Sequence, residues 1–155
     1  MQLTELLKLL VDHEVRFSVI GGVALLARGA QRTTEDLDVA YARDRQNLSR
    51  LARALAPIHP RLRGVPVALP FVLDEASLRS GLNFTLDTDL GPLDLLGEVA
   101  GLGTFEHVDE ASTELDIGGM RMLVLTLDGL ERAKRAAGRP KDLLDLGMIR
   151  ALKDG

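Results

Sequence analysis

The sequence contains no cysteine and no tryptophan, and aromatic residues make up only 3% of its 155 residues. The absence of cysteine excludes disulfides, thiolate zinc sites and cysteine catalysis. The scarcity of aromatic residues argues against a platform on which single-stranded nucleic acid would stack. The net charge of −4 is also unlike the basic balance of a dedicated nucleic-acid-binding protein.

Long hydrophobic runs are missing too, because no apolar stretch reaches the length needed to cross a membrane. The first residues mix acidic and basic side chains on a helical apolar period, which is not the pattern of a signal peptide. We therefore expect a cytoplasmic protein with no membrane partner. The three histidines are scattered, Ser18 lacks the glycine context of a serine hydrolase, and the P-loop motif is absent, so none of these sites is indicated.

Apolar spacing and turn residues predict an alternation of helices and strands. We expect helices over 2–14, 23–28, 43–55, 74–79, 127–137 and 140–153, and strands over 17–20, 36–41, 82–87, 92–96, 114–117 and 120–125. Residues 57–73 are expected to be irregular or edge structure, and 97–112 mostly loop. This order predicts an α/β (α+β) fold, a mixed sheet flanked by helices with a C-terminal helical pair. We expect one compact domain, with a core over 1–125 and a helical segment over 126–155 packed on it.

The segment 17–41 carries the most informative pattern. Asp36 and Asp38 are two residues apart on an expected strand, so both carboxylates project from the same face. Like charges this close destabilise a sheet, and a hard cation such as Mg²⁺ would neutralise them. Gly21 and Gly22 join the preceding strand to a helix whose free backbone N–H groups favour a phosphate. Together these features form the two halves of a phosphoryl- or nucleotidyl-transfer site.

The order Gly21-Gly22, Arg32-x-Thr34 and Asp36-x-Asp38 resembles the signature of the DNA polymerase β-type nucleotidyltransferase superfamily. It is most similar to the small bacterial nucleotidyltransferases that include abortive-infection-type toxins of toxin–antitoxin pairs. Antibiotic nucleotidyltransferases that modify lincosamides are a more distant likeness. The resemblance implies a nucleotidyltransferase fold, a transferase reaction and a nucleoside triphosphate such as ATP as donor. Many members have serine where this chain has Gly22, so here the backbone must serve the phosphate.

A site of this kind usually holds two metal ions, and a third carboxylate then joins the acidic pair. Asp94 is our preferred candidate, because it is an acid inside the apolar strand expected over 92–96. Asp87, on the other arm of the same hairpin, is the reserve candidate. The expected cofactor is Mg²⁺, with two ions bound and Mn²⁺ as an alternative.

The resemblance also extends to the C-terminal motif K-x-x-x-x-R-x-K-D-x-x-D, which begins at Lys134. Carried over by position, Lys134, Arg139 and Lys141 would contact the triphosphate, and Asp142 would support them. Lys141 also has the i,i+4 spacing to Asp145 of an ordinary surface ion pair. In the first motif, Arg32 would reach a phosphate and Thr34 would fix the entry to the acidic strand.

The preferred interpretation is a Mg²⁺-dependent nucleotidyltransferase that moves a nucleoside monophosphate to a hydroxyl of RNA, a protein or a small molecule. It could be a toxin-type component with a cognate antitoxin protein as its partner. One alternative is a catalytically silent module of the same fold that binds a nucleotide or a partner. Another is an antibiotic nucleotidyltransferase, whose acceptor pocket we would expect to be acidic. An RNA acceptor instead calls for an arginine-rich rim, for which Arg28, Arg32, Arg43 and Arg45 are candidates.

Overall fold

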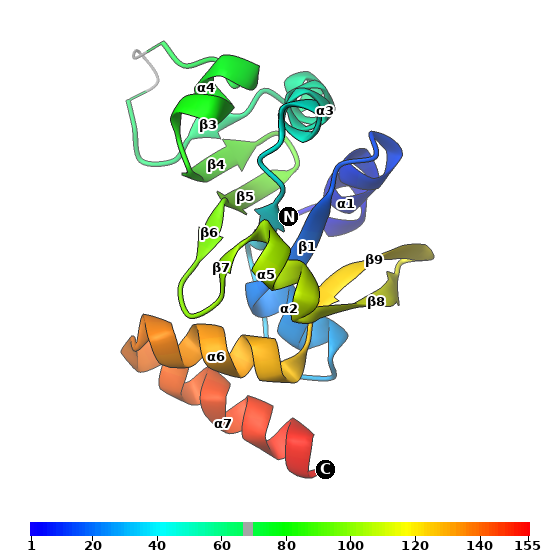
Figure 1. Ribbon diagram of the computed structural model, residues 1–155, viewed down its shortest axis with the longest axis vertical. Coiled ribbons are helices and arrows are strands. Elements are labelled where there is room, and N and C mark those ends of the chain that lie inside the picture. Colours follow the sequence, from blue (N-terminus) through cyan, green and yellow to red (C-terminus); the bar gives the residue numbers. More distant parts are fainter. Residues whose placement is uncertain (67–69) are drawn as a thin grey trace.

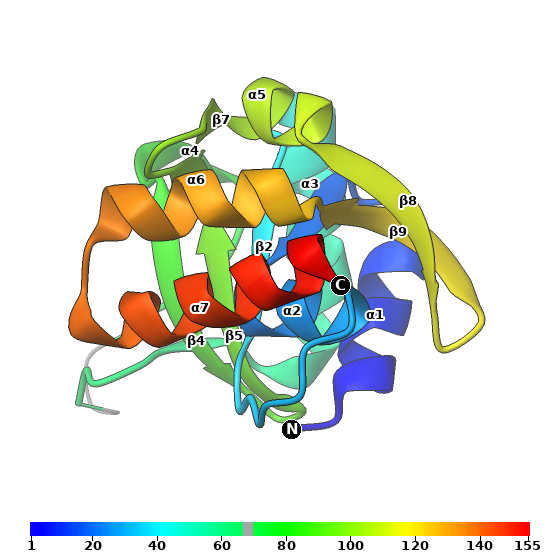
Figure 2. The same cartoon turned by 90° about the horizontal axis from the view of Figure 1, so that it is seen from below.

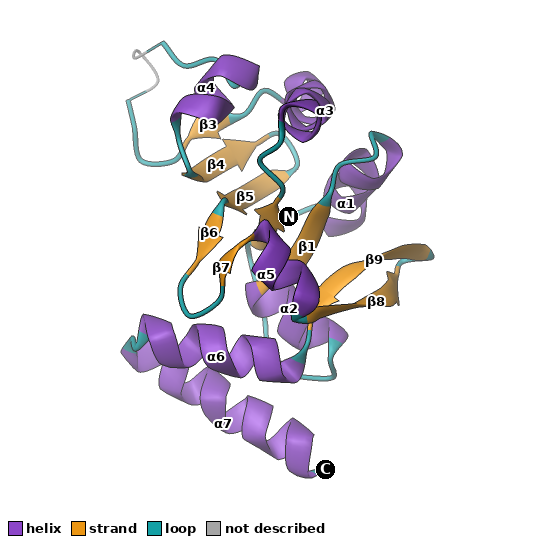
Figure 3. Ribbon diagram, in the orientation of Figure 1, coloured by secondary structure: helices purple, strands orange, loops and turns teal. Residues whose placement is uncertain are grey.

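A computed structural model describes residues 1–66 and 70–155 of the chain (Figure 1). Helices and strands alternate along it, and two helices end it (Figure 3). The helices are α1 (Leu3–Asp12), α2 (Gly21–Ala27), α3 (Arg45–Leu55), the 3-10 helix η1 (Ala56–Ile58), α4 (Glu75–Ser80), α5 (Phe105–Glu110), α6 (Leu127–Ala137) and α7 (Pro140–Asp154). The strands are β1 (Phe17–Ile20), β2 (Leu37–Tyr41), β3 (Arg61–Leu62), β4 (Asn83–Thr88), β5 (Gly91–Leu96), β6 (Glu98–Val99), β7 (Gly103–Thr104), β8 (Ser112–Ile117) and β9 (Met120–Leu125).

In the described part of the chain, seven strands form one mixed sheet in the order β3-β4-β5-β2-β1-β9-β8. Strand β2 lies at its centre, antiparallel to β1 and parallel to β5. The antiparallel register places Ile20, the last residue of β1, beside Asp38, and the parallel register places Asp94 on the other side of Asp38. The turn that follows β1 and acids from two separate strands therefore meet at one place on the sheet.

The two faces of the central strands differ because side chains alternate along a strand. Leu37 and Val39 point to one face of β2 and are fully buried, whereas Asp38 points to the other. In β5, Leu93 is fully buried beside Leu37, and Asp94 lies beside Asp38. The alternation thus assigns one face of this strand pair to the core and leaves both carboxylates on the opposite face.

Helix α1 is amphipathic, as its spacing predicts. Leu6, Leu7 and Leu10 are fully buried, whereas Lys8 and Asp12 are exposed and form an ion pair at 2.6 Å. An exposed pair of this kind contributes at most about 1 kcal/mol, so burial of the leucines holds α1 in place. Across residues 1–66 and 70–155, no helix combines the length and the apolar character needed to cross a membrane.

The two C-terminal helices are joined by a tight turn. The Thr126 side chain accepts a hydrogen bond from the backbone N–H of Gly129 and so caps α6. Helix α6 ends at Ala137 and is followed by Gly138, whose φ of 64° is the left-handed conformation that favours glycine. Pro140 then opens α7 at a position where its missing N–H is tolerated. This turn lays α6 and α7 side by side (Figures 1 and 2).

The mixed sheet with flanking helices and a C-terminal helical pair confirms the predicted fold class. The expectation of a mostly irregular loop over 97–112 is wrong, because this region holds the β6–β7 hairpin and α5. Phe105 and Val108 share one face of α5 and are buried, so packing stabilises a helix too short to persist alone. The irregular segment expected over 57–73 contains η1 and the edge strand β3, and its residues 67–69 lie outside the described residues.

Asn47 links the start of β1 to the end of β2 and is only 1% exposed. Its side-chain oxygen accepts from the Arg16 N–H at 2.6 Å, and its Nδ2 donates to the Arg16 and Ala42 carbonyls at 3.0 and 2.7 Å. Asn47→Ala leaves these backbone groups without partners, so we expect the free energy of unfolding to fall by about 2 to 4 kcal/mol. Urea denaturation followed by circular dichroism measures the change.

Asn83→Ala is the control for this prediction, because it removes an exposed amide that accepts from the Gly97 N–H at 2.9 Å. Its cost should stay below about 1.5 kcal/mol, the net contribution of an ordinary hydrogen bond. Equal losses of stability in the two variants would contradict the prediction, because the Asn47 hydrogen bonds would then contribute no more than an ordinary exposed one.

Candidate active site

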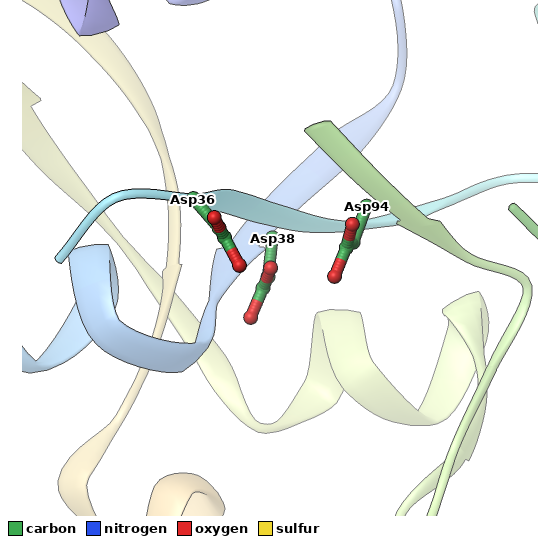
Figure 4. Close-up of side chains that lie close together, drawn as sticks. All are labelled: Asp36, Asp38 and Asp94. Carbon is green, nitrogen blue, oxygen red and sulfur yellow. The ribbon is translucent and has the colours of Figure 1, made fainter. Parts of the chain in front are cut away.

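Three carboxylates converge on one side of the β2–β5 pair (Figure 4). Asp36 precedes β2, Asp38 lies within it, and Asp94 lies within β5 at the register position next to Asp38. Each offers one carboxylate oxygen such that the three oxygens lie within 4.8 Å of one another. The structure therefore brings together the three acids that the sequence singles out.

This cluster is short of positive charge. The Asp38 Oδ1 atom is buried and has no hydrogen-bond partner among the described residues. Burial raises the pKa of Asp38 to about 6, with further increases from the charges of Asp94 and Asp36 and partial opposition from Lys134. Burial also raises the pKa of Asp94, although the nearby Arg63 guanidinium opposes the increase. An unpartnered oxygen among repelling carboxylates fits a hard divalent cation, which takes oxygen ligands.

The two glycines allow other side chains to approach the backbone closely. Gly21 has a φ of 65°, and a Cβ at this position would overlap the Asp38 carboxylate. A Cβ at Gly22 would lie 2.8 Å from the Thr34 Oγ1 atom. The helix α2 begins at Gly21 itself, two residues before the expected start. Any larger residue at Gly21 or Gly22 would therefore displace Asp38 or Thr34.

Basic side chains from three parts of the chain lie opposite the acids, each anchored by a buried acid of α7. Asp145, which is 5% exposed, accepts from Lys134 Nζ at 2.8 Å and from Arg32 Nη1 at 2.6 Å. Asp142 is fully buried, lies 2.9 Å from Arg139 Nε and 3.4 Å from Lys134 Nζ, and accepts from the Arg139 backbone N–H. The hydrogen bond from Arg139 is the largest influence that lowers the pKa of Asp142 to about 2.

A cavity of about 740 Å³ lies between the acids and these cations. Its walls include most of the residues expected at the site: Gly22, Arg32, Thr34, Asp36, Asp38, Asp94, Lys134, Arg139 and Lys141. Gly21 borders a smaller neighbouring cavity instead, and Asp142 lies buried beside Lys134 and Arg139. One cavity therefore has a cluster of acids suited to a metal ion on one wall and basic side chains suited to phosphate on another.

The reserve candidate for the third acid, Asp87, lies outside the cluster. Arg63 donates to Asp87 Oδ1 at 3.1 Å, to Asp94 Oδ1 at 3.0 Å and to the Leu86 carbonyl at 2.6 Å. It thereby orients Asp94, and sequence reasoning missed it because it lies in a segment with no motif. Sequence reasoning also missed Asp145, whose spacing suggests a pair with Lys141 although its partners come from other elements.

The arginine rim expected for an RNA acceptor does not form at this cavity. Arg28 donates to the Leu125 carbonyl at 3.1 Å, and Arg43 donates to the Tyr41 hydroxyl at 2.6 Å. Arg45 pairs with a glutamate of α4 at 3.2 Å. Of the four arginines, Arg32 alone borders the cavity in the described part of the chain. Arg43 and Arg45 follow the far end of β2, so they are turned to the α3–α4 side of the molecule.

The raised pKa of Asp38 predicts an unusual pH dependence of stability in the metal-free protein. The folded-state pKa of about 6 lies above the ordinary value of 3.8, so the folded state takes up a proton first as pH falls. The free energy of unfolding should therefore increase by about 1 kcal/mol between pH 7.5 and pH 5. Urea denaturation in EDTA measures it, and Asp38→Asn should be more stable than the wild type at pH 7.5 and lose this increase. A wild-type stability that falls over the same range would contradict the assignment.

No protein-family model and no curated protein matches the chain. Solved structures do: lincosamide antibiotic adenylyltransferase LnuA with lincomycin bound aligns at 14% identity and a TM-score of 0.64, over 97% of this chain and 96% of that chain. The antibiotic-resistance factor ANT(2'')-Ia aligns at 13% identity and a TM-score of 0.62, over 99% of this chain and 83% of that chain. An antigenic nucleotidyltransferase-like protein from Paracoccidioides brasiliensis aligns at 15% identity and a TM-score of 0.59, over 97% of this chain and 74% of that chain. The chain therefore has the nucleotidyltransferase fold, as its motifs imply.

Proposed function

We propose that this protein transfers a nucleoside monophosphate from a nucleoside triphosphate to an acceptor hydroxyl in a Mg²⁺-dependent reaction. The observation that carries the proposal is the cluster of Asp36, Asp38 and Asp94, whose oxygens lie within 4.8 Å of one another. The unpartnered Oδ1 of Asp38 supports a cation there, because a buried charge without a partner is costly. We propose that two Mg²⁺ ions bind at these carboxylates, with Mn²⁺ as a substitute.

The reaction forms a bond between the acceptor oxygen and the α-phosphorus and breaks the bond from that phosphorus to the α–β bridging oxygen. Pyrophosphate leaves with the electron pair, and the acceptor hydroxyl gives up its proton. When bound, Mg²⁺ supplies positive charge that neutralises the phosphate oxygens. A carboxylate of the acidic cluster is the proposed proton acceptor.

The cation-rich wall is the proposed binding site for the β- and γ-phosphates. Arg32 and Lys134 are held in place by Asp145, and Arg139 is held by Asp142. Lys141 is exposed and borders the same cavity, so it is placed to meet the end of the triphosphate. Cations that are fixed before the substrate arrives need no reorganisation during the reaction. The Gly22 backbone and the Thr34 hydroxyl border the same cavity and are proposed to complete this phosphate site, with the Gly21 backbone adjoining it from the smaller cavity.

Antibiotic modification is the second candidate, because the structural neighbours are named for it. LnuA is a lincosamide antibiotic adenylyltransferase, and ANT(2'')-Ia has been crystallised in complex with adenylyl-2''-tobramycin. The sequence alone supports the remaining proposals: ATP as the donor, a toxin-type role, an RNA or protein acceptor, a cognate antitoxin and a cytoplasmic location. The complete acidic cluster favours turnover over a silent binding module.

Asp38→Asn tests the reaction most sharply, because the amide keeps the shape of the carboxylate and removes its charge. Purified protein is incubated with each of the four common triphosphates, Mg²⁺ and pools of RNA, proteins or small hydroxyl compounds, and pyrophosphate is measured. We expect the wild type to release pyrophosphate, and Asp38→Asn to release it more than about 100-fold more slowly. This loss is larger than the usual effect of removing a group that only supports a metal ligand.

Asp109→Asn provides a matched control, because this aspartate is exposed on α5 and lies outside the large cavity. Its rate should stay within about twofold of the wild type, as is usual for a surface change. Triphosphate binding without any pyrophosphate release would favour the silent module. An unchanged rate in Asp38→Asn would remove Asp38 from the reaction.

A further inference from the structure

A second cavity, of about 360 Å³, adjoins the acidic cluster on another side. It lies between the ends of β1 and β5, the start of the β6–β7 hairpin and helix α6. Leu96, Val99, Leu130 and Ala133 give it a largely apolar lining. Its volume lies near the lower end of the range for small-molecule sites, about 300 to 1,000 Å³. The cavity therefore suits a compact apolar group rather than a polymer.

The two cavities share part of their walls. Asp38, Lys134 and Arg139 border both, so the acidic cluster and its nearest cations lie at the boundary between them. The large cavity has further cations, Arg32 and Lys141, which the small one lacks. The acidic cluster thus faces a cavity lined by many charged side chains on one side and a largely apolar cavity on another.

Resting on the proposed function, we propose that the small cavity binds the acceptor, and that the acceptor is an uncharged, largely apolar small molecule carrying a hydroxyl. In phosphoryl-type transfer the attacking and leaving oxygens lie roughly in line, on opposite sides of the phosphorus. The leaving pyrophosphate is negatively charged, so it would lie against the cations of the large cavity. The attacking hydroxyl then approaches from the other side of Asp38, where the apolar cavity opens.

Charge argues against a polycationic acceptor. Among the described residues that border the small cavity, Asp38 is the sole acid, and it belongs to the metal-binding type of cluster. Lys134 and Arg139 border the same space, and like charges repel in a partly desolvated site. The small cavity therefore lacks the acidic lining expected for a cationic antibiotic, whereas Glu35, Asp36 and Asp94 line the large one.

The nucleoside has a better place in the large cavity. Leu144 and Met148 of α7 form an apolar wall there, next to the cations proposed for the phosphates. Recognition of a nucleobase usually uses a few placed polar groups. Apart from Asp38, Lys134 and Arg139, the described lining of the small cavity consists of aliphatic residues and glycine. The two substrates thus occupy separate spaces that meet at the acidic cluster.

Two probes of matched shape test this assignment: cyclohexylmethanol and cyclohexylmethylamine, which is a cation at neutral pH. Their dissociation constants for the full chain are measured by protein-observed NMR titration. We expect the alcohol to bind at least about fivefold more tightly than the amine, because the cavity cannot compensate a buried positive charge. Equal or tighter binding of the amine, or no binding of the alcohol, would overturn the proposal.

Two alanine variants locate the bound alcohol. Ala137 is exposed on α6 and borders the small cavity, whereas Ala151 is exposed on α7 and borders neither cavity. Ala137→Phe should fill the space and weaken alcohol binding at least about fivefold, and Ala151→Phe should leave it within about twofold. An alcohol that binds equally well to Ala137→Phe lies elsewhere, which would overturn the proposal.

A final titration separates the acceptor from the nucleoside. The alcohol is titrated into wild-type protein saturated with ATP, and its dissociation constant should stay within about twofold of the value without ATP. Displacement of the alcohol by ATP would assign the cavity to the nucleoside and overturn the proposal. These measurements need no turnover, so a failure of the acceptor assignment is distinct from a failure of nucleotidyl transfer in the Asp38→Asn experiment.

Discussion

The repulsion among three carboxylates on neighbouring strands is the constraint on which the rest of the structure depends. The parallel register of β2 and β5 places Asp38 beside Asp94, and Asp36, one residue before β2, lies close to both. The Gly21 backbone fits against the Asp38 carboxylate only because it has no side chain. Arg63 fixes Asp94 from the far side without removing the charge excess. The sheet thus stores an electrostatic cost that a bound cation would relieve.

The basic side chains at the α6–α7 pair do not neutralise the three carboxylates, because they are already paired with acids of α7. The charge of Lys134 acts on Asp38, yet Asp145 and Asp142 of α7 already hold this lysine at 2.8 and 3.4 Å. Its influence on the pKa of Asp38 is therefore outweighed by burial and by the neighbouring acids. Buried ion pairs add little stability because desolvation offsets their attraction, so this network is better understood as positioning. It fixes Arg32, Lys134 and Arg139 in the wall of the cavity that the acidic cluster also lines.

The sequence could predict those features of the site that are local along the chain. The glycine turn and the acidic pair both lie within 17–41, where strand alternation alone decides which side chains share a face. The choice of Asp94 over Asp87 depended on which hairpin arm pairs with β2, and the structure places Asp94 on that arm. Arg63 and Asp145 could not be found, because their partners are distant in sequence and no spacing links them. The small cavity likewise arises from elements that meet only in the folded chain.

The central claim is that these three acids share cations beside a bound triphosphate. It is tested most directly by anomalous diffraction from crystals soaked with Mn²⁺ and a non-hydrolysable triphosphate analogue. The account predicts Mn²⁺ peaks within about 2.3 Å of carboxylate oxygens from Asp36, Asp38 and Asp94, with the phosphates toward the cations. A bound triphosphate whose Mn²⁺ lies away from all three carboxylates would contradict it.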